Sequence, residues 1–517
     1  MVFSDLFFIY VFLPAAAICY ALGRCGDHSR MRRLREYGQP RIRCECPYSN
    51  AVLIIFSLIF YAWGEPIYVA LMIVSVFMNY VVGVFIDGGR HKSKSALIVG
   101  LILNIGIIAV FKYADFLAET LNAVGVPMPK PGIALPIGIS FFTFQSISYI
   151  IDVYRGQVRA QKDFFSLLLY ISMFPQLIAG PIVRYSTISA EINRRSISMH
   201  DLAEGSFRFL VGLGKKVILA NQLGELSAAF LDGDFASLST GGAWIGILAY
   251  TMQIYFDFSG YSDMAIGMGR CMGFHFDENF NYPYVTRTIT EFWRRWHISL
   301  GSFFRDYVYI PMGGNRRHQP LTISKAFLNW GRHARQHLGS HIGKVLPTAV
   351  ASLITFLVIG IWHGASWNFV LWGLYFGAII MLEKYTIVKI QDRIPGFILH
   401  IYSLFIIVFG WVIFYFTDIS RMGGFIGILF GGGASGWNLV AQNELTGNLW
   451  LIIAGIVCCL PIGKGIRSIY EKAAYDGSAG AEVLLTGAKT LCAAALLVSC
   501  TLLLIGSTTN PFLYLRF

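Results

Sequence analysis

Long apolar runs with few charged residues recur along the whole chain, and they limit its possible folds more than any other feature. A helix needs about 20 apolar residues to cross the hydrocarbon core of a bilayer. Several runs are shorter, so we expect those to form kinked or re-entrant helices that neighbouring helices bury. The candidate spans lie near 3–22, 51–63, 67–86, 96–111, 135–151, 164–183, 207–230, 241–258, 345–362, 366–384, 397–416, 448–463 and 483–507. The sequence therefore predicts an all-α polytopic membrane protein with roughly ten or more transmembrane helices.

The composition excludes a soluble protein. Hydrophobic residues make up 55% of the chain and charged residues only 14%, whereas soluble domains carry about 25% charged residues. The formal net charge of +12 does not require a nucleic-acid partner, because Lys and Arg accumulate in the cytoplasmic loops of membrane proteins. Basic residues cluster in 24–43, 87–95 and 155–162. We expect these loops to be cytoplasmic, which places the N-terminus on the extracytoplasmic side.

Two groups of cysteine and histidine residues are potential metal ligands. They are Cys25, His28, Cys44 and Cys46, and His333, His337 and His341. The first group fits no common zinc spacing. The second follows helical spacing, but the arginine and lysine residues around it would repel a cation. We therefore predict no metal site.

The segment from Asp257 to Arg335 is too polar to cross lipid as a simple helix, although apolar runs flank it. Irregular backbone at membrane depth occurs where protein buries it or where it lines a water-filled cavity. We therefore expect this segment to be re-entrant or surface-lying around a polar cavity and to carry function. Gly267, Gly269 and Gly273 miss the dinucleotide-binding spacing, and they predict close helix packing instead.

His363 directly follows the apolar run 345–362. An ionisable side chain at this depth is costly unless it faces protein or a water-filled cavity, so His363 is a candidate functional residue. Gly360 and Gly364 flank it and would let another backbone or a substrate approach closely. The alternative is a buried histidine that only packs and hydrogen-bonds, and these residues alone leave both interpretations open.

His297 lies in a segment where polar and aromatic residues alternate at helical spacing. On one helix, Thr290, Arg294, His297 and Gly301 would share a face, and large apolar side chains would occupy the opposite side. A polar stripe of this kind needs a wet cavity or polar partners. The alternative is an amphipathic helix at the membrane interface, which explains the Trp and Arg residues but not the histidine.

An ordered set of motifs runs almost from end to end and is densest from 136 to 375. It comprises Met1–Ser4, Phe60–Gly64, Pro136–Gln145, Phe174–Pro181, Phe256–Gly267, Asn279–Tyr284, the segments around His297 and His363, Phe304–Pro311 and Gly313–Arg316. This set resembles the membrane-bound O-acyltransferase superfamily and, more narrowly, the membrane subunits of bacterial alginate O-acetyltransferases. Each motif is weak alone, but their order is highly specific. The stretches 24–50 and 330–345 look like insertions relative to the family.

The resemblance implies one membrane domain over 1–517, with a catalytic core at about 136–385 and short helices around a central tunnel. It implies a multi-pass protein of the bacterial inner membrane, surrounded by lipid. Acetyl-coenzyme A, as a substrate and not a bound cofactor, would donate acetyl groups from the cytoplasm. The acetyl groups would pass to an extracytoplasmic polysaccharide such as alginate, with the help of extracytoplasmic acetyltransferase or acceptor partner proteins.

The resemblance also implies roles for single residues. His363 matches the catalytic histidine of the family, and a histidine suits the task of taking a hydroxyl proton at neutral pH. His297 matches the second motif position, where it would orient the acceptor or polarise the acyl carbonyl. Residues expected to bind substrate or donor are Arg294, Arg295, Arg305, Trp293, Asn281 and Asn368. The arginines would hold coenzyme A phosphates or, equally well, lipid phosphates, and Asp257 and Asp263 would be their ion-pair partners.

Two other functions remain open at this point. Within the family, the related teichoic-acid branch transfers D-alanyl groups from a carrier protein. Outside it, a transporter or scaffold of a polysaccharide export complex would use the same cavity without chemistry. Such a protein would tolerate loss of His363, whereas an enzyme would not.

Overall fold

The computed structural model describes residues 2–36, 44–88, 93–178, 180–314, 329–330, 332–333, 336–337, 340–475, 479–506 and 512–513, and within these ranges all regular structure is helical. In this described part of the chain, eight helices are long and apolar enough to cross a membrane. They are Phe8–Leu34, Pro47–Gly64, Tyr68–Asp87, Ser93–Ala123, Val345–His363, Trp367–Arg393, Gly396–Tyr415 and Val483–Gly506. Together with two shorter apolar helices, Ile419–Gly432 and Leu449–Cys459, they confirm the predicted polytopic all-α fold.

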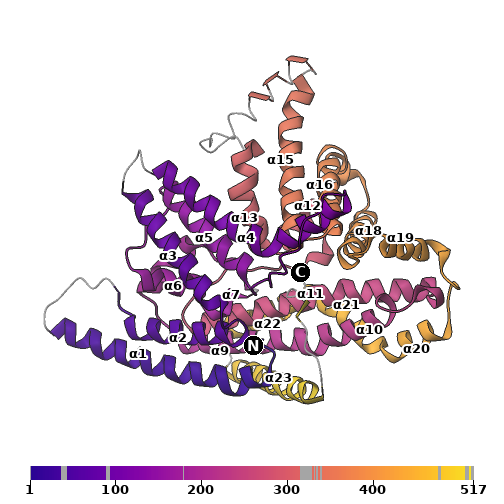
Figure 1. Ribbon diagram of the computed structural model, residues 1–517. Helices are drawn as coiled ribbons and strands as arrows, with labels where there is room; N and C mark the ends of the chain where they lie inside the picture. Colours follow the sequence, from indigo (N-terminus) through magenta and orange to yellow (C-terminus); the bar gives the residue numbers. More distant parts are fainter. Residues whose placement is uncertain are drawn as a thin grey trace. The chain divides into compact units, whose positions relative to one another are not determined.

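The chain divides into two compact units. The first contains Met1–Gly214, Gly260–Glu278 and Leu496–Arg516. Its helices are η1 (Phe8–Phe12), α1 (Leu13–Glu36), α2 (Pro47–Gly64), α3 (Tyr68–Asp87), α4 (Ser93–Ala123), α5 (Ile139–Tyr154), α6 (Phe164–Ser172), α7 (Phe174–Leu177), α8 (Tyr185–Asn193) and α9 (Met199–Gly214), with the second part of α11 (Thr240–Cys271) and the end of α23 (Ala479–Gly506). In this unit α5 packs against both α3 and α4, and α1 packs along α2 (Figure 1).

The second unit contains Lys215–Ser259 and Asn279–Ala495. Its helices are η2 (Lys215–Ala220), α10 (Asn221–Leu231), η3 (Phe235–Ser237), the first part of α11, η4 (Pro283–Val285), α12 (Ile289–Arg295), α13 (Ile298–Phe304), η5 (Arg305–Gly314), α15 (Ser340–His363), α16 (Trp367–Tyr385), α17 (Ile387–Ile390), η6 (Gln391–Arg393), α18 (Gly396–Tyr415), α19 (Ile419–Gly427), η7 (Ile428–Gly432), α20 (Leu439–Gly447), α21 (Leu449–Cys459), α22 (Ile462–Tyr475) and the first part of α23. Helices α15 and α16 lie side by side, and α16 also contacts α12 and α18 (Figure 1).

One predicted span is a broken helix, although it is as long as a full crossing requires. The run 164–183 forms the short helices α6 and α7, which meet at Met173 in a non-helical conformation (φ −52°, ψ 115°). Pro175 stands in the first turn of α7, where its missing N–H is tolerated. The polar segment predicted to begin at Asp257 begins later than expected, because Asp257–Cys271 belongs to the 32-residue helix α11.

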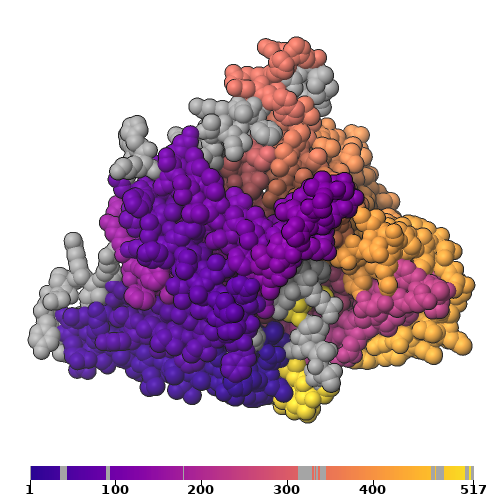
Figure 2. Space-filling view, viewed as in Figure 1, coloured from indigo at the N-terminus to yellow at the C-terminus, as the bar shows by residue number. Residues whose placement is uncertain are grey.

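Large apolar side chains cover the outside of the first unit. Figure 2 shows α1–α4, in indigo and purple, as a continuous surface on one face of the molecule. Ile55 on α2, Phe77 on α3 and Ile102 on α4 are each more than half exposed. An exposed apolar surface of this kind is expected where helices face lipid rather than water.

Glycines bring α9 close to the second part of α11. A Cβ atom on Gly212 would lie 2.5 Å from the carbonyl oxygen of Gly260, and one on Gly267 would lie 2.5 Å from that of Gly205. Small residues at such contacts let membrane helices approach closely. The prediction that Gly267 serves helix packing is therefore confirmed.

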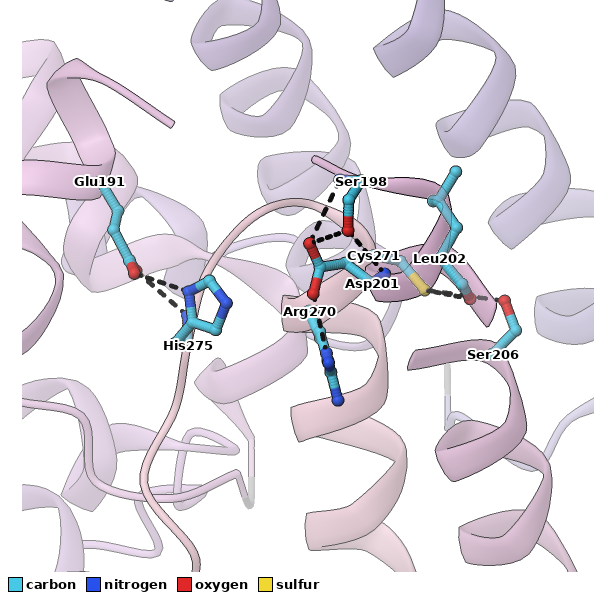
Figure 3. Close-up of polar contacts among 8 residues, drawn as sticks. All are labelled: Glu191, Ser198, Asp201, Leu202, Ser206, Arg270, Cys271 and His275. Carbon is cyan, nitrogen blue, oxygen red and sulfur yellow. Dashed lines mark hydrogen bonds and ion pairs between the residues drawn. The ribbon is translucent and has the colours of Figure 1, made fainter. Parts of the chain in front are cut away.

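Polar contacts join the same two helices and α8 near Cys271 (Figure 3). Arg270 lies 3.1 Å from Asp201, which also accepts a 2.6 Å hydrogen bond from Ser198. In the loop that follows α11, His275 contacts Glu191 of α8 at 2.8 Å. These contacts fix the end of α11 within the first unit.

Replacing Gly212 by Ala should destabilise the protein by about 1–3 kcal/mol, because the added methyl group must push two helix backbones apart. A matched control is Gly106→Ala on α4, where no atom lies within 4 Å of the added Cβ atom. The control should be neutral or slightly stabilising, since alanine favours a helix by up to about 1 kcal/mol over glycine. Thermal unfolding in detergent measures both, and equal unfolding temperatures for the two variants would contradict close packing at Gly212.

Candidate active site

His363 is the last residue of α15 and is buried, with 8% of its surface exposed. Three aromatic rings surround it: its centroid lies 4.8 Å from Trp362, 5.0 Å from Trp372 and 5.3 Å from Phe414. These rings come from α15, α16 and α18. Rings from three apolar helices therefore shield His363 from most of the solvent.

The tight turn after His363 depends on its flanking glycines. A Cβ atom on Gly360 would lie 2.2 Å from the carbonyl oxygen of Phe369, and one on Gly364 would lie 2.1 Å from the ring of Phe369. These glycines therefore let the neighbouring helix α16 approach closely. The sequence had left open whether another backbone or a substrate would approach them. Asn368, expected to bind substrate, is fully buried and donates hydrogen bonds to the carbonyl oxygens of Ile413 and Phe414, both at 3.2 Å.

His297 lies between two short helices and not within one long helix. Trp296 is extended (φ −100°, ψ 127°), and His297 has a left-handed backbone conformation (φ 44°, ψ 56°). The expectation that Thr290, Arg294 and Gly301 share a helix face with His297 is therefore wrong. A non-glycine residue with positive φ is strained by about 1–3 kcal/mol and persists only where its surroundings enforce it.

Two backbone hydrogen bonds enforce this conformation. Asn281 N–H donates to the carbonyl oxygen of Arg295 at 3.0 Å, and Ile298 N–H donates to that of Asn279 at 2.9 Å. The Asn279–Asn281 segment thus lies alongside the break in the helix. Tyr282, which follows it, is the other non-glycine residue with positive φ in the described part of the chain.

Asn279 is a site residue that the sequence reasoning did not single out. It is 1% exposed, and its Oδ1 lies 3.0 Å from His297 Nδ1. The same oxygen accepts hydrogen bonds from the backbone N–H (3.2 Å) and the hydroxyl group (2.9 Å) of Ser299. Its place in the Asn279–Tyr284 motif was the only available signal.

A buried carboxylate fixes the beginning of α12. Glu383 of α16 is fully buried and accepts hydrogen bonds from the backbone N–H groups of Ile289 (2.6 Å) and Thr290 (2.8 Å) and from the Thr290 hydroxyl (2.8 Å). Unpaired N–H groups at a helix start are favourable partners for negative charge. This contact ties the start of α12 to the end of α16, the helix that follows His363 in the chain.

One aromatic ring packs near both histidines. The Trp362 ring lies 4.8 Å from His363 and 6.3 Å from His297. Phe258 packs edge-to-face on His297 at 4.6 Å. Trp293, expected to bind substrate, packs on Trp372 at 5.4 Å and so belongs to the same aromatic cluster. The second unit therefore brings together His363, His297 and Trp293.

The three arginines predicted to bind phosphate differ in their acidic partners. Arg294 is exposed, and no acidic partner for it is found among the described residues. Arg295 pairs with Glu291 at 2.6 Å, and Arg305 pairs with Asp306 at 2.7 Å. The hydrogen bond that Arg305 donates to Asp306 raises the pKa of Arg305. Asn281 Oδ1, expected to bind substrate, accepts a 2.6 Å hydrogen bond from Lys464.

The predicted ion pairs of the aspartates exist, but with other partners. Asp257 pairs with Lys216 at 2.5 Å, and Asp263 pairs with Arg208 at 2.8 Å. The prediction that Arg294, Arg295 or Arg305 would be the partners was therefore wrong. The observed partners, Lys216 and Arg208, lie on elements distant in sequence from those arginines.

Burial controls the protonation of His297, which lies outside the eight apolar helices. It lowers the pKa of His297 to about 3, so the ring is neutral at physiological pH.

The described residues include no group of three His, Cys, Asp or Glu side chains that could hold a metal ion. Some predictions fall outside the described residues. They concern 37–43 of the first insertion, several positions of the second insertion at 330–345, Asn315 and Arg316 of the last motif, and the side chain of His341.

Known proteins resemble this chain over much of its length. Residues 140–328 match the model of the membrane-bound O-acyltransferase family. The chain is 37% identical, over 93% of its length and 85% of the relative, to a probable alginate O-acetylase of Pseudomonas syringae pv. tomato. It is 32% identical, over 80% and 77%, to a peptidoglycan O-acetyltransferase of Helicobacter pylori. A teichoic acid D-alanyltransferase of Bacillus subtilis is 27% identical over 46% of this chain and 56% of the relative.

Proposed function

This chain belongs to the membrane-bound O-acyltransferase family, and we propose that it transfers acetyl groups across or at the membrane for the O-acetylation of an extracytoplasmic polysaccharide. It is an acyltransferase and a multi-pass membrane protein. The observation that carries the proposal is the pair of buried histidines, His297 and His363, which both lie next to the Trp362 ring within a single unit. Relatives that act as O-acetylases span most of this chain, whereas the D-alanyltransferase spans less than half of it, and this difference favours acetyl over D-alanyl.

In the proposed reaction His363 is the general base. The acceptor hydroxyl oxygen attacks the carbonyl carbon of an acetyl thioester, while His363 takes the hydroxyl proton. A carbon–oxygen bond forms, the carbon–sulfur bond breaks, and the leaving thiolate recovers the proton from His363. General-base assistance of this kind contributes about 10²–10⁴-fold to a rate.

Acetyl-coenzyme A is the proposed donor, approaching from the cytoplasm. Of the three arginines expected to hold its phosphates, Arg294 is the best suited, because Arg295 and Arg305 already pair with carboxylates. A free guanidinium group binds phosphate through charge-assisted hydrogen bonds. Lipid phosphate is an equally suitable ligand for an exposed arginine at a membrane surface.

The proposed setting is the inner membrane of a bacterium, with the N-terminus on the extracytoplasmic side. We infer that partner acetyltransferases or acceptor proteins on that side receive the acetyl group and pass it to the polymer. The named relatives act on alginate and on peptidoglycan, so the polymer here is proposed only as a hydroxyl-rich polysaccharide.

The test is acetyl transfer by the full chain in nanodiscs, with acetyl-coenzyme A labelled in the acetyl group. We expect release of free coenzyme A that increases when an alginate or peptidoglycan oligosaccharide, with a partner acetyltransferase, is added. The polymer that acquires label identifies the acceptor class. Release only from an acylated carrier protein would instead indicate the D-alanyl type of donor. No release from any thioester would overturn the proposal.

A further inference from the structure

The hydrogen bonds around Asn279 determine the orientation of its amide group. Oxygen and nitrogen of such a group must be assigned from the partners that they face. A backbone N–H can only donate, and the Ser299 N–H points at the Asn279 side chain over 3.2 Å. The atom that it meets must therefore be the amide oxygen Oδ1, because the amide nitrogen would also donate.

This assignment determines which nitrogen of His297 carries a hydrogen. The same Oδ1 lies 3.0 Å from His297 Nδ1. An amide oxygen only accepts, so Nδ1 has to be the donor. Burial keeps the ring neutral, and a neutral imidazole has one N–H and one lone pair. The lone pair therefore belongs to Nε2.

We propose that Asn279 is a positioning residue that holds His297 as its Nδ1–H tautomer, so that Nε2 accepts a hydrogen bond from the acceptor hydroxyl group. This inference rests on the proposed function and decides between the two roles considered for His297. A neutral ring without hydrogen on Nε2 cannot polarise an acyl carbonyl through that atom. His297 therefore orients the alcohol, and His363 takes the proton.

The backbone around His297 supports this role. The left-handed conformation of His297 is strained, yet the paired Asn279–Asn281 segment enforces it. Phe258 at 4.6 Å and Trp362 at 6.3 Å limit how far the ring can move. A catalytic histidine is commonly oriented by a hydrogen bond to its other ring nitrogen, and Asn279 supplies that hydrogen bond here.

Nuclear magnetic resonance of the full chain with ¹⁵N-labelled histidine tests the tautomer without any substrate. The His297 signals are those missing from the spectrum of His297→Gln. At neutral pH we expect a protonated Nδ1 and an unprotonated Nε2. The opposite pattern, or a doubly protonated ring, would overturn the inference whether or not the protein transfers acetyl groups.

Activity of Asn279 variants tests the role. Asn279→Leu removes the acceptor of the Nδ1 hydrogen and should lower kcat by about 100-fold, within the range of general acid–base assistance. Asn279→Asp keeps the acceptor but adds a negative charge, which raises the pKa of His297. The ¹⁵N signals of His297 should therefore show the ring taking up its second proton at a higher pH than in the wild type.

Controls separate the outcomes. The same substitutions at Asn443, an exposed residue of α20, should change neither kcat nor the pH at which His297 takes up its second proton. A folded Asn279→Leu protein with full activity, or an Asn279→Asp protein in which His297 takes up its second proton at the wild-type pH, would overturn the role of Asn279. An inactive wild type would contradict the proposed function instead, and the resonance experiment would still decide the tautomer.

Discussion

Replacing His363 by Gln should reduce acetyl transfer by about 10²–10⁴-fold, the usual contribution of a general base. Glutamine retains a similar size and can form hydrogen bonds, but it cannot take up a proton near neutral pH. The packing of Trp362, Trp372 and Phe414 around this position should therefore survive, so the loss would reflect chemistry and not unfolding. Release of coenzyme A from labelled acetyl-coenzyme A, measured at equal folded yield, gives the comparison.

His200→Gln is the matched control, because His200 is exposed on α9 and far in sequence from both site histidines. It should retain wild-type activity. A transporter or scaffold would also retain its function after His363→Gln as long as the cavity remained open. Undiminished turnover in the folded His363→Gln protein would therefore reject His363 as the base, whereas no turnover by either protein would favour the non-enzymatic alternative.

The sequence predicted the long helices well, because the free energy of placing a helix in lipid depends mainly on its own residues. The predicted run 397–416 corresponds to Gly396–Tyr415, and 345–362 corresponds to Val345–His363. His363 was found for the same reason: an ionisable residue at the end of an apolar run is conspicuous.

The surroundings of His297 could not be predicted in this way. No Gly or Pro marks the end of α12 at Arg295, and the break at Trp296 and His297 depends on hydrogen bonds to Asn279 and Asn281. Such partners are separated in sequence by about the length of one membrane helix, and only the folded chain brings them together. The same limitation explains why the partners of Asp257 and Asp263 were misassigned, since periodicity carries no information about tertiary ion pairs.

The buried pair Lys216–Asp257 should contribute to folding in a way that single and double substitutions can separate. Both side chains are at most 3% exposed, and they lie 2.5 Å apart. Breaking such a pair leaves an uncompensated buried charge and costs about 3–5 kcal/mol. Lys216→Met and Asp257→Leu should therefore each lower the unfolding temperature strongly. The double variant should recover most of the loss, because replacing both charges by apolar side chains is often neutral or stabilising.

The double variant also tests whether the pair serves catalysis. Phe258, next to Asp257, packs on His297, so a displaced α11 would disturb the site and each single variant should lose activity as well as stability. If the pair only holds α11 in place, the double variant should regain both acetyl transfer and its unfolding temperature. A double variant that is stable but inactive would show that the charge of Asp257 or Lys216 acts on the reaction. Single variants as stable as the wild type would contradict the buried ion pair itself.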